Sequence, residues 1–327
     1  MRPVCGADED CLEFLAQSLP ADQLQNPCNR SVRRGHLECL RYAHEQGSRW
    51  GEWTCTFASE NGHLDCLRYA HEQGCPWDEK TCRWASKNGR IDCLRYAHEQ
   101  GCPWNTKTCS WASWGGHLDC LRYAHENGCP WNGWTCSWAC ASGHLECLRY
   151  AHENGCPWNE MTTRNASKGG HLDCLRYAHE QGCPWDEKTC SWASLNGQLE
   201  CLRYAHEHGC PWDRWTCQDA SEMGRLQCLR YALENDCPAP EVWPVVHPDV
   251  IGYLHHRGVR PSPGNSANFR DHIRAHAHKA KALLRCAIRL LASYRHTCER
   301  VYAPGGEGYM MAEASFLESV SLDQSEN

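Results

Sequence analysis

The sequence predicts an all-α solenoid of stacked helix-turn-helix repeats, followed by a long C-terminal helix. Three observations predict it. A glycine recurs every 27 residues, each interval carries a helical apolar pattern, and that pattern ends in Gly and Pro. The recurring glycines are Gly35, Gly62, Gly89, Gly116, Gly143, Gly170, Gly197 and Gly224. An unbroken period over eight copies indicates one unit stacked on itself, and we number each repeat from its glycine as position 1.

The first helix of each repeat is predicted to start near position 3 and to end near position 12. In GHLDCLRYAHEQG, residues 62–74, Asp65, Arg68 and Glu72 lie within about 60° on a helical wheel. We expect them to form a wet stripe with charge pairs at i,i+3 and i,i+4, and the other positions to bury most of the helix. Gly74 is expected to end the helix in the left-handed conformation, and Pro76 prevents its continuation.

A second, shorter helix is predicted to complete each unit. In the same copy Thr81 is a plausible N-cap, and the helix should run through Cys82 and Ala85 to Asn88, just before the next glycine. Each repeat is therefore expected to be a helical hairpin.

The cysteines and histidines repeat with the same period. Of the 27 cysteines most occupy positions 5, 14 and 21, where the exceptions are Ser48 and Thr163; position 10 is His in seven copies and Leu233 in the eighth. Small or apolar replacements favour core packing over metal ligation, and no C-x-x-C pair occurs in the chain. We expect no cofactor, although a metal- or redox-responsive Cys/His array stays open as the alternative. The position 10 histidines are expected to form buried hydrogen bonds to backbone.

Composition and charge limit the compartment and the partners. The first residues, MRPVCGADEDCLEF, lack an apolar signal-peptide core, so we expect reduced thiols and an intracellular location, cytoplasmic with the nucleus also open. No apolar run reaches the 18 residues of a membrane span. The net charge of −7 gives no reason to expect nucleic acid on the repeat array.

The run GHLDCLRYAHEQGCPW followed by Asn or Asp resembles the inner half of an ankyrin repeat, and the segment from Thr81 to Ala85 resembles a worn Thr-Pro-Leu-His-Leu-Ala helix. The resemblance covers roughly residues 10–260. Ankyrin repeats run 33 residues, and the six missing here fall between Asp78 and Cys82, where the family has its β-hairpin finger. The chain is thus similar to the shortened, finger-less ankyrin-like arrays of protists, algae and giant viruses. The resemblance implies a protein-binding scaffold.

The ends of the array are expected to be caps. We predict an N-terminal capping half-repeat over 1–34, eight repeats over 35–240, a degenerate capping repeat over 241–260 and a linker over 261–268.

The segment 269–302 is predicted to be one long basic amphipathic helix, with eight Lys or Arg against two acids. Capping of the last repeat, a coiled-coil or partner helix, and a basic surface for membranes, acidic proteins or RNA all stay open. The acidic segment 303–327 is predicted to be disordered.

No catalytic motif stands apart from the repeats. Gly-x-Ser-x-Gly, phosphate-binding Gly-rich loops and His-Glu-x-x-His are all absent from the sequence. A catalytic site is a single asymmetric constellation, whereas the distinctive residues here are repeated. The chain is therefore predicted not to be an enzyme.

Positions 18, 19, 22 and 26, on and around the second helix, change from copy to copy, whereas positions 3, 5, 6, 7, 8, 11 and 24 are nearly uniform. Three tryptophans at position 19 are expected to be exposed, and exposed aromatic and basic residues are frequent interface anchors. A neutral, drifting surface is the competing interpretation. The candidate partner-binding residues are Trp53, Lys80, Arg83, Lys107, Trp114, Trp134, Met161, Arg164, Lys188 and Trp215.

Overall fold

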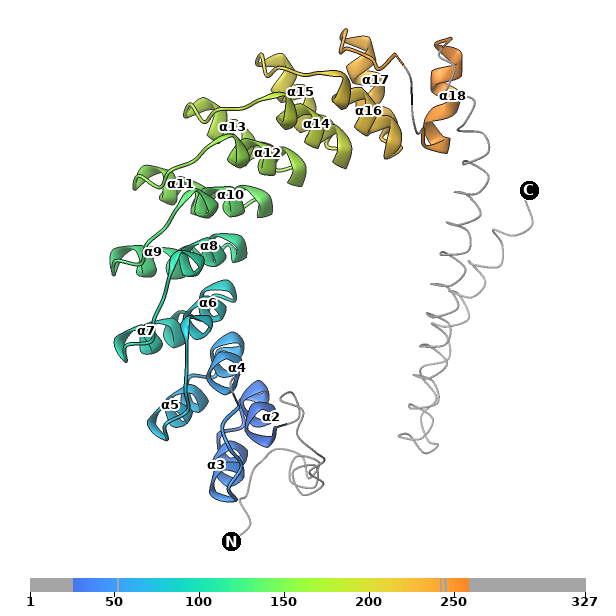
Figure 1. The fold of residues 1–327 in the computed structure, drawn as a ribbon. Coiled ribbons are helices and arrows are strands. Elements are labelled where there is room, and N and C mark those ends of the chain that lie inside the picture. Colours follow the sequence, from blue (N-terminus) through green and yellow to red (C-terminus); the bar gives the residue numbers. More distant parts are fainter. Residues whose placement is uncertain (1–25, 52, 242, 244–245, 259–327) are drawn as a thin grey trace, which may run out of the picture. The chain divides into compact units, whose positions relative to one another are not determined.

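A computed structural model of the chain describes residues 26–51, 53–241, 243 and 246–258. These residues form 17 helices and no strand (Figure 1). The predicted linker, basic helix 269–302 and tail 303–327, with most of the N-terminal cap, lie outside the described residues. None of the described helices is both long and apolar enough to cross a membrane.

The odd-numbered helices carry the uniform sequence LDCLRYAHE and its variants, nine residues each. They are α3 (Leu37–Glu45), α5 (Leu64–Glu72), α7 (Ile91–Glu99), α9 (Leu118–Glu126), α11 (Leu145–Glu153), α13 (Leu172–Glu180), α15 (Leu199–Glu207) and α17 (Leu226–Glu234).

The even-numbered helices carry the variable sequence and are not shorter, with eight to ten residues each. They are α2 (Pro27–Arg34), α4 (Thr54–Asn61), α6 (Glu79–Lys87), α8 (Thr106–Gly115), α10 (Gly133–Ser142), α12 (Glu160–Gly169), α14 (Glu187–Asn196) and α16 (Arg214–Glu222). Figure 1 shows that each kind of helix forms its own row along the array. The even-numbered helices make the more extensive contacts with one another, so their row is the tighter of the two.

Side chains and backbone set the helix ends. Gly74 follows α5 with φ +79°, and the next N–H, of Cys75, reaches the carbonyl of Ala70 at 2.9 Å, so the left-handed ending is confirmed. The predicted N-cap Thr81 is wrong, because Asp78 caps α6 by accepting the backbone N–H of Lys80 at 2.9 Å. Thr81 lies inside the helix and is buried. Only residues 73–78 connect α5 to α6, which leaves no room for a hairpin finger.

The odd-numbered helices bury one stripe. In α5, Cys66, Leu67 and Ala70 are at most 1% exposed, and Asp65 and Glu72 lie in water as expected. Leu64, Tyr69 and His71 are only half-buried, so the buried face is narrower than predicted. Leucines at position 6 repeat through the core, which is one continuous cluster. Full burial of each such leucine contributes about 1.5–3 kcal/mol relative to exposure.

The charged stripe behaves differently from the prediction. Among the described odd-numbered helices, Arg41 and Glu38 alone reach ion-pair distance, at 3.9 Å. The position 7 arginines instead lie over tyrosine rings of the following repeat, as Arg68 does 5.4 Å from the centroid of Tyr96. Contact with a ring in the next unit makes the stripe an inter-repeat element as well as a solvated surface.

The histidines of position 10 bond to a side chain, not to backbone as expected. His71 Nδ1 lies 3.0 Å from the hydroxyl of Tyr96 in the next repeat, and its ring stacks on Trp77 at a centroid distance of 3.8 Å. The Trp77 ring meets Tyr96 edge-on at 6.3 Å. This His–Tyr–Trp contact recurs at seven junctions, from His44–Tyr69 to His206–Tyr231.

The last described helix, α18 (Pro248–His256), follows α17 after a shortened interval. Its residues Val250 and Leu254 are fully buried. His247 packs over Gly224 in the way that position 2 of each repeat packs over the preceding position 1 glycine, as His117 does over Gly89. This placement supports a truncated ninth repeat as the C-terminal cap.

Candidate functional site

The even-numbered helices present their variable residues on one face. Positions 20, 21, 24 and 25 are Thr, Cys, Ala and Ser in most copies and are buried in the core. Positions 19, 22, 23 and 26 lie within about 100° of one another on the opposite side of the wheel. We call these four positions of α4 to α16 the variable face. The Asn or Asp at position 17 starts each helix at a fixed register, as Asn132 does by accepting the N–H of Trp134 at 3.1 Å.

Five tryptophans from α6, α8 and α10 form a continuous cluster on the variable face. Successive rings are 5.1 to 6.2 Å apart between centroids, in edge-on or tilted contact. The cluster comprises Trp84, Trp111, Trp114, Trp138 and Trp134. Trp114, Trp134 and Trp138 are exposed, and Trp134 leaves 51% of its surface in water. An apolar group of this size in water is a common mark of an interaction site.

Two basic residues hold the cluster from α6. The ammonium of Lys87 lies 4.4 Å from the ring centroid of Trp84 and 4.6 Å from that of Trp114. The guanidinium of Arg83 lies 4.6 Å from the Trp111 centroid. Two buried donors here, Arg83 Nε and Trp84 Nε1, have no hydrogen-bond partner among the described residues. The cluster is thus a mixed cation–π surface and not a purely apolar one.

Trp53 and Lys80 form a smaller group on α4 and α6. Trp53 stacks on Phe57 at 6.0 Å and is half-buried against the core, so the expectation that it is exposed was wrong. Lys80 lies 4.8 Å over the Trp53 ring and forms an ion pair with Asp78 at 3.0 Å. Packing by Phe57 and Lys80, which are one turn and one repeat away, accounts for the burial.

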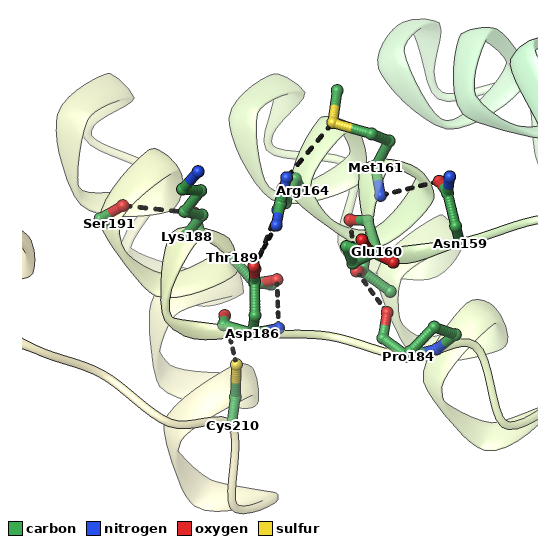
Figure 2. A network of polar contacts seen from close by, with 11 residues as sticks. Asn159, Glu160, Met161, Arg164, Pro184, Asp186, Lys188, Thr189, Ser191 and Cys210 are labelled. Carbon is green, nitrogen blue, oxygen red and sulfur yellow. Dashed lines mark hydrogen bonds and ion pairs between the residues drawn. The ribbon is translucent and has the colours of Figure 1, made fainter.

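Met161 and Arg164 on α12 are tied to the next repeat (Figure 2). Arg164 Nε donates to Asp186 Oδ1 at 2.9 Å, Nη2 contacts Oδ2, and Nη1 lies 3.4 Å from the sulfur of Met161. Hydrogen bonding to Asp186 raises the pKa of Arg164 further above its ordinary value. Asp186 is the N-cap of α14, so this bidentate pair brackets two repeats.

The remaining predicted residues lie on the same face at separate places. Lys107, Lys188 and Trp215 are exposed, and Trp215 leaves 47% of its surface in water. No ring contact joins Trp215 to the tryptophan cluster in the part of the chain that the structure describes. The structure therefore brings together Trp114 and Trp134, with Arg83 beside them.

Sequence reasoning missed position 23, which supplies three of the five clustered tryptophans. Trp84, Trp111 and Trp138 lie four residues after position 19 and therefore on the same side of the helix. Position 23 also varies, with Phe57, Asn165 and Asp219 elsewhere in the array. Its spacing from the variable positions 19 and 26 was the signal that could have found it.

The thiols and imidazoles serve the packing between repeats. Cys102 Sγ, for example, approaches the backbone carbonyl of Asp78 in the preceding repeat at 3.3 Å. All 23 described cysteines are free and buried, and burial raises the pKa of Cys66 and Cys93 to about 12. No group of three His, Cys, Asp or Glu side chains is placed to hold a metal ion within the described residues. Thiolates, which metals and oxidants need, are disfavoured at such sites.

Residues 136–179 match the family model described as ankyrin repeats (many copies). The crystal structure of the human ASB11 ankyrin repeat domain is similar, with a TM-score of 0.42 and 16% sequence identity over 48% of this chain and 84% of that chain. The comparison with curated proteins found no match. The matched segment spans more than one full period of the array, and its residue pattern recurs in the other repeats.

Proposed function

The repeats of this chain belong to the ankyrin repeat family, and we propose that the chain is a non-enzymatic scaffold that binds a protein along its variable face and the adjoining loops. Ankyrin repeats generally mediate protein–protein interaction. The proposal rests on one observation above all, the exposed tryptophan cluster held by Lys87 and Arg83 on α6 to α10.

Three features of the cluster suit an interface. Tryptophan and arginine are enriched among residues that dominate binding energy. The rings are fixed by contacts with one another and with Lys87, so little conformational entropy is lost when a partner covers them. The face also varies between repeats, whereas the odd-numbered helices repeat nearly one sequence, and a specific partner requires a surface that differs along its length.

The experiment uses the full chain as the target for a displayed library of random 12-residue peptides. Selected peptides are rebound to the wild type and to the double variant Trp134→Ala with Lys107→Glu. A matched control, Arg122→Glu with Glu126→Lys, changes two exposed residues of α9 instead. Circular dichroism confirms that each variant is folded.

Loss of a dominant tryptophan costs about 2 kcal/mol or more, so we expect at least a roughly thirtyfold weaker Kd for the first variant and little change for the control. The opposite pattern would show that the uniform stripe of the odd-numbered helices is the binding surface. Failure to select any peptide above background would also count against the proposal.

A further inference from the structure

The two rows of helices expose different charges. At positions 19, 22, 23 and 26 of α6 to α14 there is no Asp or Glu, although the whole chain carries a net charge of −7. Seven of these twenty positions are basic: Lys80, Arg83, Lys87, Lys107, Arg164, Lys168 and Lys188. The exposed stripe of the odd-numbered helices carries two acids for each arginine in the first seven repeats. Positive charge is therefore concentrated on the variable face.

The basic residues lie on both sides of the exposed tryptophans. Four of them come from α6 and the start of α8, and three come from α12 and α14. Between them, Trp114 on α8 with Trp134 and Trp138 on α10 form the exposed part of the cluster. Along the array the order is thus cationic, aromatic, cationic.

Several of these cations have no acidic partner of their own. Lys80 and Arg164 form ion pairs with Asp78 and Asp186, whereas Lys107 and Lys188 are exposed and form no ion pair with a described residue. The ammonium of Lys87 contacts indole rings only, in the part of the chain that is described. A carboxylate brought to these groups adds a favourable interaction without breaking one already formed.

Resting on the proposed function, we propose that the partner of this face is an acidic peptide segment with a central aromatic or large aliphatic residue. The central residue packs against Trp114, Trp134 and Trp138. Acids on one side of it meet Lys87 and Lys107, and acids on the other side meet Lys168 and Lys188. The anchor supplies the buried apolar area, while the acids set direction and register along the repeats.

A single-stranded nucleic acid fits the same face less well. The helix starts carry acids beside it, including Asp78, Glu79 and Glu187, and a phosphate at every nucleotide would face some of them. Lys87 and Arg83 already occupy ring faces on which bases would stack. A peptide can space its acids to avoid these carboxylates.

The first test is the composition of the peptides selected on the full chain. We expect net negative sequences in which acids flank an aromatic or large aliphatic residue. One such peptide, labelled with a fluorophore, is then compared by anisotropy with versions in which the anchor or the flanking acids are replaced by Ser. Each replacement is expected to weaken binding at least tenfold, and loss of the acids should remove most of the salt dependence.

The second test is a charge exchange. The variant Lys107→Glu with Lys188→Glu is expected to bind the acidic peptide at least tenfold more weakly and to gain binding of a version whose acids are changed to Lys. The matched control Arg122→Glu with Arg176→Glu, on α9 and α13, should do neither. A 12-nucleotide oligo-dT is added as a competitor and should not displace the peptide at equal concentration.

The outcomes separate this inference from the proposed function. Neutral or basic peptides that still depend on Trp134, or displacement by oligo-dT, overturn the acidic partner and leave the variable face as the binding surface. Peptides that depend on the odd-numbered helices overturn both proposals.

Discussion

The hydroxyl of Tyr231 lies 3.0 Å from Nδ1 of His206 in the preceding repeat, whereas the equivalent hydroxyl of Tyr253 is buried without a hydrogen-bond partner among the described residues. The residue that would serve Tyr253 is Leu233, the one position 10 residue of the eight repeats that is not histidine. The chain thus contains its own comparison of a junction with and without this bond.

Leu233→His is expected to stabilise the C-terminal end of the array. It would give the Tyr253 hydroxyl a partner, and one such hydrogen bond contributes about 1 kcal/mol. Urea unfolding followed by hydrogen exchange in α17 and α18 measures the gain. The same substitution made in a Tyr253→Phe background should bring no gain, and an equal gain there would assign the effect to packing.

Leu121→Ala is expected to destabilise the middle of the array. Leu121 is fully buried at position 6 of α9, and such truncations cost about 2–5 kcal/mol. Because each repeat contacts its neighbours, hydrogen exchange should increase first in α8 to α11 and least in α3 and α17. A uniform loss of protection along the array would contradict this nearest-neighbour behaviour.

The thiols at position 5 are expected to react slowly in the native chain. Burial raises the pKa of Cys66, Cys93 and Cys120 to about 12, so almost no thiolate exists at pH 8. Alkylation at these cysteines, followed by mass spectrometry, should be at least a hundredfold slower than in denaturant. In denaturant nearly all 27 cysteines should titrate as free thiols; a regular set of disulfides would contradict this.

Asp219 on α16 is expected to make the array less stable as the pH rises from about 4 to about 6. Burial, with Glu222 and Asp213 nearby, raises the pKa of Asp219 from 3.8 to about 6. In this window the folded chain binds more protons than the unfolded chain, so the free energy of unfolding falls with rising pH.

Asp219→Asn should therefore stabilise the chain at pH 7.5 and have little effect below pH 4. Because the carboxyl is only half-buried, solvent screening reduces the gain to about 1 kcal/mol. Urea unfolding at both pH values measures it, with the exposed Glu234→Gln as control. An equal gain at both pH values would show that the charge is not responsible.

The period, the two helices of each repeat and the buried leucines could be predicted because eight internal copies show which positions tolerate change. Left-handed Gly74 followed from the same comparison. The N-cap could not be assigned with equal certainty, because Asp78 and Thr81 are both capping residues and the copies keep a polar residue at each position, except for Gly51 at position 17.

The candidate site was predictable in position but not in arrangement. The variation at positions 19, 22 and 26 pointed to the second helix, yet pairing of Trp114 with Trp138 or of Arg164 with Asp186 depends on how neighbouring repeats are offset. A helical wheel describes one helix and contains no information about that offset. The same limit explains why the histidines were expected to bond to backbone: the tyrosine they meet lies 25 residues away.

The His–Tyr bond always joins residues 25 apart, so every junction is interchangeable with the next. Excision of 98–124, for instance, would place His125 directly after Ala97, where His98 stood, and leave Tyr150 as its partner. The gene can therefore lose or gain whole units by unequal recombination without creating an incompatible seam. Selection is then free to adjust the length of the array, and the order of its variable helices, separately from its foldability.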